Sequence, residues 1–223
     1  MRYPVTLQYK ILLKDVCYIF MFISCSQIFG LMGAFGGVIV QEVVIWDLSE
    51  DLGSIMAAAC VIVGLVSAIL VSVTLLKYKN QFMIFIVFQV FSAIGICISY
   101  LGLTLKNIPV IIVGTLVYSI FTFPSFPIMI ELIGKRVGKP FELVATGNVY
   151  FMTQVITALV LAIVGALLNY KEKSKSTYSF ILITGLLLLN GLFGYIASIT
   201  SRWPFNSHEL IQKTLNNEKM NDE

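Results

Sequence analysis

The sequence predicts an all-α, polytopic membrane protein with six transmembrane helices. The chain has 223 residues, of which 58% are hydrophobic and only 12% are charged, whereas a soluble domain carries roughly 25% charged residues. Several stretches of more than 20 residues contain no charged side chain, among them 52–76, 80–105, 107–130, 143–170 and 176–201. As helices, such stretches can cross the roughly 30 Å of hydrocarbon in a bilayer. They are too long and too continuous for the alternating strands of a barrel, the other structure that satisfies its backbone in lipid.

Charged segments separate the expected spans and mark where each one ends. The first apolar run follows the mixed segment 1–15 and is too long for a cleavable signal peptide, so we expect it to stay in the membrane. Lys77 and Lys79 end the second span, Lys106 ends the third, and a charged turn at 134–140 separates the fourth from the fifth. The expected helices lie near 16–41, 52–76, 81–105, 108–133, 144–168 and 177–200.

The distribution of Lys and Arg predicts the orientation. Eleven of the 15 fall on the side that holds both chain ends, and four, mostly at 171–175, fall on the other. Because basic loops stay in the cytoplasm, we expect both termini there. Residues 1–15 then form a linker-like segment, 16–200 the transmembrane domain, and 201–223 a polar, disordered tail.

Composition argues against several classes of function. The four cysteines lie within the expected spans and the one histidine, His208, lies in the tail, so no metal site and no cofactor is expected. The net charge of +3 is spread over several loops, which argues against a nucleic-acid partner. The expected spans contain no His, no Asp and no nucleophile motif, so a membrane-bound enzyme is not expected.

The fifth expected span carries the clearest polar face. Gly147, Tyr150, Gln154 and Thr157 recur at intervals of three or four residues and share one side of the helix. Gln154 lies about 15 Å from the start of the span, near the middle of the bilayer. Because intramembrane polar groups concentrate function, Gln154, Tyr150 and Thr157 are candidates to line a substrate pathway. Alternatively, Gln154 binds a neighbouring helix, which stabilises by about 0.6 kcal/mol on average.

Small residues mark the first span. Gly30, Gly33 and Gly37 leave room either for a closely packed neighbour or for a gating movement. Gln27 and Phe35, on the same helix, are further candidates for the pathway.

The fourth span and its exit contain residues that suit a switch. Pro124 and Pro127 each remove a backbone donor, so they mark either a gating hinge or a static bend. In the turn that follows, Glu131, Arg136 and Glu142 form either a cytoplasmic charge network that holds one conformational state, or a set of caps and loop pairs. Glu142 suits a first helical turn because the helix dipole favours a carboxylate there.

Three stretches resemble one known family. GAFGGVIVQEVV (33–44) resembles the end of its seventh helix, and VGLVSAILVSVTLLKYKN (63–80) resembles its eighth. PIMIELIGKRVGKPFELVATGNVYFMTQ (127–154) resembles a family pattern that is carried here by Glu131, Leu132, Glu142, Gly147 and Gln154. Over about residues 8–200, the chain thus resembles the C-terminal half of the feline leukaemia virus subgroup C receptor-related family. These are heme and choline/ethanolamine transporters of the major facilitator superfamily.

The resemblance implies a fold and a function. The fold is one half of a major facilitator solute carrier, six helices arranged as two inverted three-helix repeats. The function is transmembrane transport of a small choline-, ethanolamine- or heme-like organic solute by alternating access, with Gln154 lining the substrate site. The expected partners are the lipid bilayer, the solute, and either a missing N-terminal six-helix half or a second copy.

Two further expectations concern the mode of action. Because no Asp or Glu lies deep within an expected span, facilitated or exchange transport is expected rather than proton coupling through these six helices. The alternative function is a non-transporting, degenerate half-transporter that acts as a membrane interaction protein.

Overall fold

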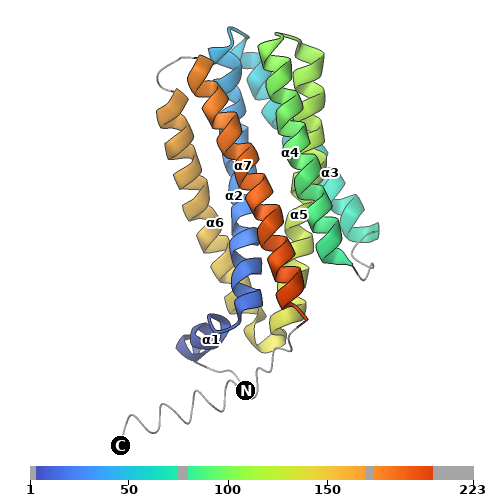
Figure 1. The fold of residues 1–223 in the computed structure, drawn as a ribbon, viewed down its shortest axis with the longest axis vertical. Helices are drawn as coiled ribbons and strands as arrows, with labels where there is room; N and C mark the ends of the chain where they lie inside the picture. Colours follow the sequence, from blue (N-terminus) through green and yellow to red (C-terminus); the bar gives the residue numbers. More distant parts are fainter. Residues whose placement is uncertain (1–3, 75–79, 169–172, 203–223) are drawn as a thin grey trace, which may run out of the picture.

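The computed structural model describes residues 4–74, 80–168 and 173–202. Within these ranges it forms seven helices and no strand (Figure 1): α1 (Val5–Leu12), α2 (Val16–Ile45), α3 (Glu50–Thr74), α4 (Gln81–Thr104), α5 (Ile108–Val137), α6 (Lys139–Leu168) and α7 (Lys173–Thr200). The helices α2 to α7 are each long and apolar enough to cross a bilayer. Over the described ranges the prediction of an all-α fold with six long apolar helices is confirmed, and this architecture fits a multi-pass membrane protein. The expectations for Lys77, Lys79 and Lys171, and for the tail beyond 202, lie outside the described residues.

Several helices are longer than the apolar pattern predicts. α2 continues to Ile45 and α5 to Val137, and α6 begins at Lys139, because charged side chains in the outer turns can reach the interface while the backbone stays helical. Asp15 begins α2, where its side chain accepts a hydrogen bond from a backbone N–H of the first turn. Gly138, with φ of 75°, ends α5 and allows the chain to turn into α6.

A short helix occupies the segment that the sequence analysis assigned to a linker. α1 buries Leu7, Ile11 and Leu12 and packs against α6, where the Tyr9 hydroxyl donates to the Asn148 side chain. Eight residues are too few for a stable isolated helix. Tertiary packing therefore stabilises α1, which is why its sequence alone did not indicate it.

Successive spans run in opposite directions (Figure 1). α2, α4 and α6 begin at the end of the bundle where α1 lies, and α3, α5 and α7 end there. We call this the α1 end and the opposite one the far end. Residues 4 and 202 therefore lie at the same end of the molecule.

The centre of the bundle is formed by α2 and α5. α2 packs against α3, α5, α6 and α7, and α5 packs against α2, α3, α4 and α6. The most apolar stretch is 50% buried in α2 and 44% buried in α5, against 39% in both α4 and α7 and 22% in both α3 and α6. One core cluster, around Phe85 and Phe141, lies near the α1 end, and a second, around Phe35 and Tyr118, fills the far half. α3 and α6 are therefore the peripheral helices.

Glycines bring α4 and α5 into close contact. A Cβ atom added at Gly114 would lie 2.3 Å from the backbone nitrogen of Ser99, and one added at Gly95 would lie 2.5 Å from that of Tyr118. The Ser99 and Thr115 hydroxyls hydrogen-bond across the same seam at 3.1 Å. Small residues that let backbones approach are a main source of helix association in lipid, so these contacts hold α4 tightly against α5.

Candidate functional site

Three aromatic rings from three helices meet about halfway along the bundle. Phe29 of α2 stacks on Phe126 of α5, with ring centroids 4.2 Å apart. Tyr150 of α6 presents its edge to both, at 6.1 Å from Phe29 and 5.8 Å from Phe126. Tyr150 lies about 17 Å from the start of its helix and is 47% exposed. The cluster is thus open on the α6 side, and it includes Phe126, which the sequence analysis did not name.

Gln154 lies one turn beyond Tyr150 on α6 and is exposed. Its amide forms no hydrogen bond within the described part of the chain. The other mid-span amides differ: Gln27, Gln89 and Asn190 are each buried and hydrogen-bonded to a neighbouring helix. The described structure therefore contains no helix partner for Gln154, although such a partner was the alternative expected from sequence.

The glycine face of α2 packs on α6. A Cβ atom at Gly30 would lie 2.7 Å from the Ile156 side chain, and one at Gly33 would lie 3.3 Å from that of Thr157. The Thr157 hydroxyl lies 3.3 Å from the Gly30 carbonyl oxygen. Gly37 is more loosely placed, 3.4 Å from a side-chain atom of α6. These contacts show the close packing that was one of the two expected roles of the glycines.

Two of the predicted pathway residues lie away from this cluster. The Gln27 side chain donates to the Leu186 carbonyl oxygen of α7 at 2.8 Å. Phe35 is 2% exposed, and its ring centroid lies 4.3 Å from that of Tyr118. Neither residue is brought together with Gln154 in this conformation, because both side chains point into the bundle.

The two prolines lie inside a continuous α5. Pro124 cannot donate to the carbonyl of Ile120, four residues earlier. The Ser67 hydroxyl of α3 donates to this freed oxygen at 2.6 Å. A neighbouring helix thus satisfies the break at Pro124, as membrane proteins require. Pro127 is half-buried, one turn closer to the α1 end.

The charges at the α1 end are paired differently from the predicted network. Arg136 forms a two-bond ion pair with Asp15, its Nε 2.8 Å from Oδ2 and its Nη2 3.0 Å from Oδ1. Both side chains are largely buried, with 12% and 6% of their surfaces exposed. Glu131 instead pairs with Lys135 at 2.5 Å. Glu142 is exposed and forms no ion pair in the described ranges. The expected network of Glu131, Arg136 and Glu142 is therefore replaced by two separate pairs.

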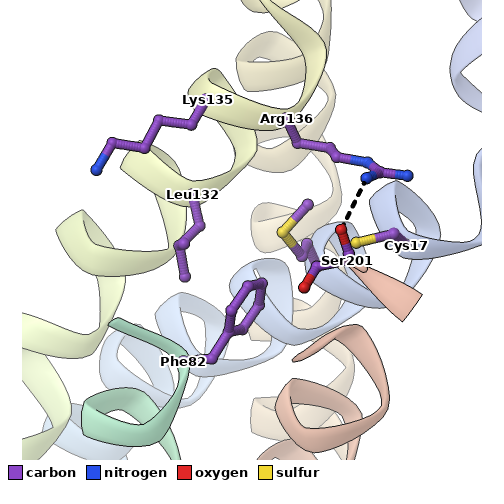
Figure 2. A pocket seen from close by; sticks show the side chains of 7 residues that line it. Cys17, Phe82, Leu132, Lys135, Arg136 and Ser201 are labelled. Carbon is purple, nitrogen blue, oxygen red and sulfur yellow. Dashed lines mark hydrogen bonds between the residues drawn. The ribbon is translucent and has the colours of Figure 1, made fainter. Parts of the chain in front are cut away.

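Arg136, one partner of the buried pair, lines a pocket of about 350 Å³ (Figure 2). Arg136 also donates from Nη1 to the Ser201 carbonyl oxygen at 3.3 Å. It thereby ties the end of α5 to the start of α2 and to the residues after α7. The remaining lining residues are Cys17, Met21, Phe82, Leu132 and Lys135, of which only Lys135 is charged.

A chain of polar side chains links four helices inside the bundle. Ser24 of α2 donates to Asn190 of α7, Asn190 donates to Gln89 of α4 at 3.3 Å, and Gln89 donates to Ser125 of α5 at 3.0 Å. Neither Gln89 nor Asn190 is among the site residues predicted from the sequence. Each is a lone polar residue in an apolar run. The sequence therefore shows how far along its helix each residue lies, but not which neighbouring helix its side chain contacts.

A buried carboxylate lies near the far end of α2. Glu42 directly follows the expected span 16–41, but in the structure it lies within α2 and is fully buried. The burial of this carboxylate was not predicted from the sequence. α2 continues one turn past Glu42, and α7 covers this turn with Ser176 and Ser179.

No group of three or more His, Cys, Asp or Glu side chains suited to a metal occurs in the described ranges. Neither a comparison with known protein families nor a search of curated proteins finds a match for this chain. The candidate site therefore consists of three aromatic rings and an exposed amide at one level of the bundle. Such groups can hold an organic solute through aromatic contacts and hydrogen bonds.

Proposed function

We propose that this chain is one six-helix half of a major facilitator transporter that moves a small organic solute by alternating access. The observation that carries the proposal is the exposed Gln154 amide beside the open aromatic cluster of Phe29, Phe126 and Tyr150. An unsatisfied amide facing hydrocarbon is costly. A water-filled passage, closed on its other side by a second half, removes that cost.

The site chemistry suits a solute with a cationic or hydroxyl-bearing group. Aromatic faces attract ammonium groups, most strongly where water is excluded. The Tyr150 hydroxyl and the Gln154 amide add donors and acceptors. Choline- and ethanolamine-like solutes fit this description, and heme is the third candidate by resemblance.

The packing of the helices supports two related triplets, α2–α4 and α5–α7. The first helix of each triplet packs against the second helix of the other: α2 on α6, and α5 on α3. The third helix of each packs against the first of the other: α4 on α5, and α7 on α2. The buried share of the most apolar stretch also matches between equivalent helices. It is 22% in the second helix of each triplet, α3 and α6, and 39% in the third, α4 and α7. This pattern is the one expected of inverted three-helix repeats.

In this proposal α2 moves against α6 during transport. Gly30, Gly33 and Gly37 form the contact along which it slides, and the breaks at Pro124 and Pro127 let α5 follow. The Asp15–Arg136 pair closes the α1 end, which is cytoplasmic in this scheme. The exposed face of α2 and α6 packs against either an N-terminal half or a second copy.

Binding and uptake of labelled choline, ethanolamine and heme test the proposal. The chain is reconstituted in liposomes alone and co-expressed with candidate partner halves. Gln154→Ala removes hydrogen bonds to the solute, so we expect its affinity to fall about tenfold. Tyr150→Ala opens the aromatic cluster and should reduce affinity at least as much.

Phe151→Ala is the matched control. Phe151 is the next residue of α6, is 73% exposed, and lies outside the cluster, so its loss should leave binding unchanged. If Phe151→Ala and Tyr150→Ala weaken binding equally, the site is wrong. If no solute binds in any combination, the degenerate, non-transporting half is the better interpretation.

A further inference from the structure

Glu42 occupies a closed polar site at the far end of the bundle. Its side chain is fully buried, and its two carboxylate oxygens contact the hydroxyls of Ser176 and Ser179, one each. The Trp46 indole N–H donates to the Ser176 oxygen at 2.9 Å. Both partners of the carboxyl group are uncharged, so the site contains a carboxyl group held only by neutral hydroxyls.

The nearby charges are engaged elsewhere. Lys106 and Lys173 lie 3.4 and 3.0 Å from Asp47, and their hydrogen bonds, with that of Lys173 the stronger influence, hold the pKa of Asp47 below its ordinary value. The Lys173 ammonium also lies 5.4 Å from the centre of the Trp46 ring. No cation of the described chain contacts Glu42.

The remaining charges at this end come from α3 and α7. α3 begins with two exposed acids, Glu50 and Asp51, and Lys175 of α7 precedes Ser176. The parts of α5 and α6 at the far end bring no charged residue in the described ranges. Burying an ionised carboxylate without a cation is costly, whereas a protonated carboxyl needs only hydrogen-bond partners.

The hydrogen bonds around Glu42 can be completed in both protonation states. When the carboxyl is ionised, Ser176 and Ser179 each donate one hydrogen to it. When it is protonated on the oxygen facing Ser179, the new O–H donates to the Ser179 oxygen. Ser179 then turns its own hydrogen to the Ser176 carbonyl oxygen, 2.9 Å away. Ser176 donates to the other carboxyl oxygen throughout, so one proton from water is added and no donor is left unpaired.

We propose that Glu42 is a reversible proton-binding site between α2 and α7, in which Ser179 reverses its hydrogen bond as the proton is taken up or released. The inference rests on the contacts of Glu42 and not on the solute pathway. It goes beyond the proposed function because it assigns a proton-binding group that the solute pathway does not include.

Infrared difference spectroscopy of the full chain in bilayer discs tests the site without requiring transport. Spectra are recorded in H₂O and D₂O while the pH is stepped from about 5 to about 9. We expect a carbonyl band of a protonated carboxyl that shifts in D₂O, loses intensity as the pH rises, and is absent in Glu42→Gln. Glu131→Gln, which removes a carboxylate paired with Lys135 near the α1 end, should leave this band in place.

If Glu42→Gln does not fold, a second variant still tests the proposal. Ser179→Ala removes the acceptor of the carboxyl hydrogen, so the band should shift to higher frequency. The proposal is overturned if the band persists in Glu42→Gln, if it does not change with pH, or if Ser179→Ala leaves its frequency unaltered.

Discussion

Arg136→Ala is expected to destabilise the protein by about 3 kcal/mol, because it leaves a buried carboxylate without its cation. Arg136 meets both oxygens of Asp15 at 2.8 and 3.0 Å, and the exposed fractions of the two side chains are 12% and 6%. The pair joins α5 to α2. Arg136 also donates to the carbonyl oxygen of Ser201, which follows α7. Asp15 keeps its capping bond to α2, which places the loss at the lower end of the range for buried pairs. Reversible unfolding in mixed detergent micelles measures the change in free energy.

Lys135→Ala is the matched control, because Lys135 precedes Arg136 and forms an exposed pair with Glu131. Such a pair contributes about 0–1 kcal/mol. The double variant Asp15→Asn with Arg136→Ala should recover part of the loss, since no uncompensated charge remains. Glu142→Gln should show no coupling to Arg136→Ala. If Lys135→Ala and Arg136→Ala lose the same free energy of unfolding, the buried pair stabilises the protein no more than the exposed pair does.

Gly114→Ala is expected to destabilise the α4–α5 seam by about 1–3 kcal/mol or more. The added carbon would lie 2.3 Å from the backbone nitrogen of Ser99, and backbone atoms cannot move aside as a flexible side chain can. The two helices must therefore separate, which also weakens the hydrogen bond between Ser99 and Thr115. The same detergent unfolding experiment reports the loss.

Gly165→Ala provides the comparison for Gly114→Ala. A Cβ atom added at Gly165 of α6 meets nothing within 4 Å, and alanine favours the helix by up to roughly 1 kcal/mol over glycine. This variant should be neutral or slightly stabilised. A Gly114→Ala protein that unfolds like the wild type would show that α4 and α5 do not pack this closely.

The sequence predicted the class of fold well because the relevant signal is local. A span needs about 20 apolar residues whatever surrounds it, and each of the six helices contains such a run. Helix ends were predicted less well. The apolar pattern stops at the hydrocarbon edge, whereas α2 continues past Glu42 to Ile45. α1 was not predicted, because its stability comes from burying Leu7 and Ile11 against other helices.

The candidate site was only partly accessible from sequence. Spacing alone placed Tyr150 and Gln154 on one face of a helix, and the structure has both on the exposed side of α6. Spacing did not bring Phe126 of α5 to Tyr150, nor did it show that Gln27 and Phe35 point into the bundle. Those facts depend on how helices far apart in sequence rotate against one another.

The sequence by itself determined how many helices cross the membrane and the depth of each polar residue, because both follow from counting along one helix. Only the tertiary structure decided which polar groups meet: Asp15 with Arg136, Asn190 with Gln89, and Glu42 with two serines of α7. The physical reason is the solvent. In water, an apolar stripe marks the buried face of a helix, but in lipid both the buried and the outer faces are apolar. The orientation of each helix is therefore set by packing and by buried hydrogen bonds, which no single stretch of sequence contains.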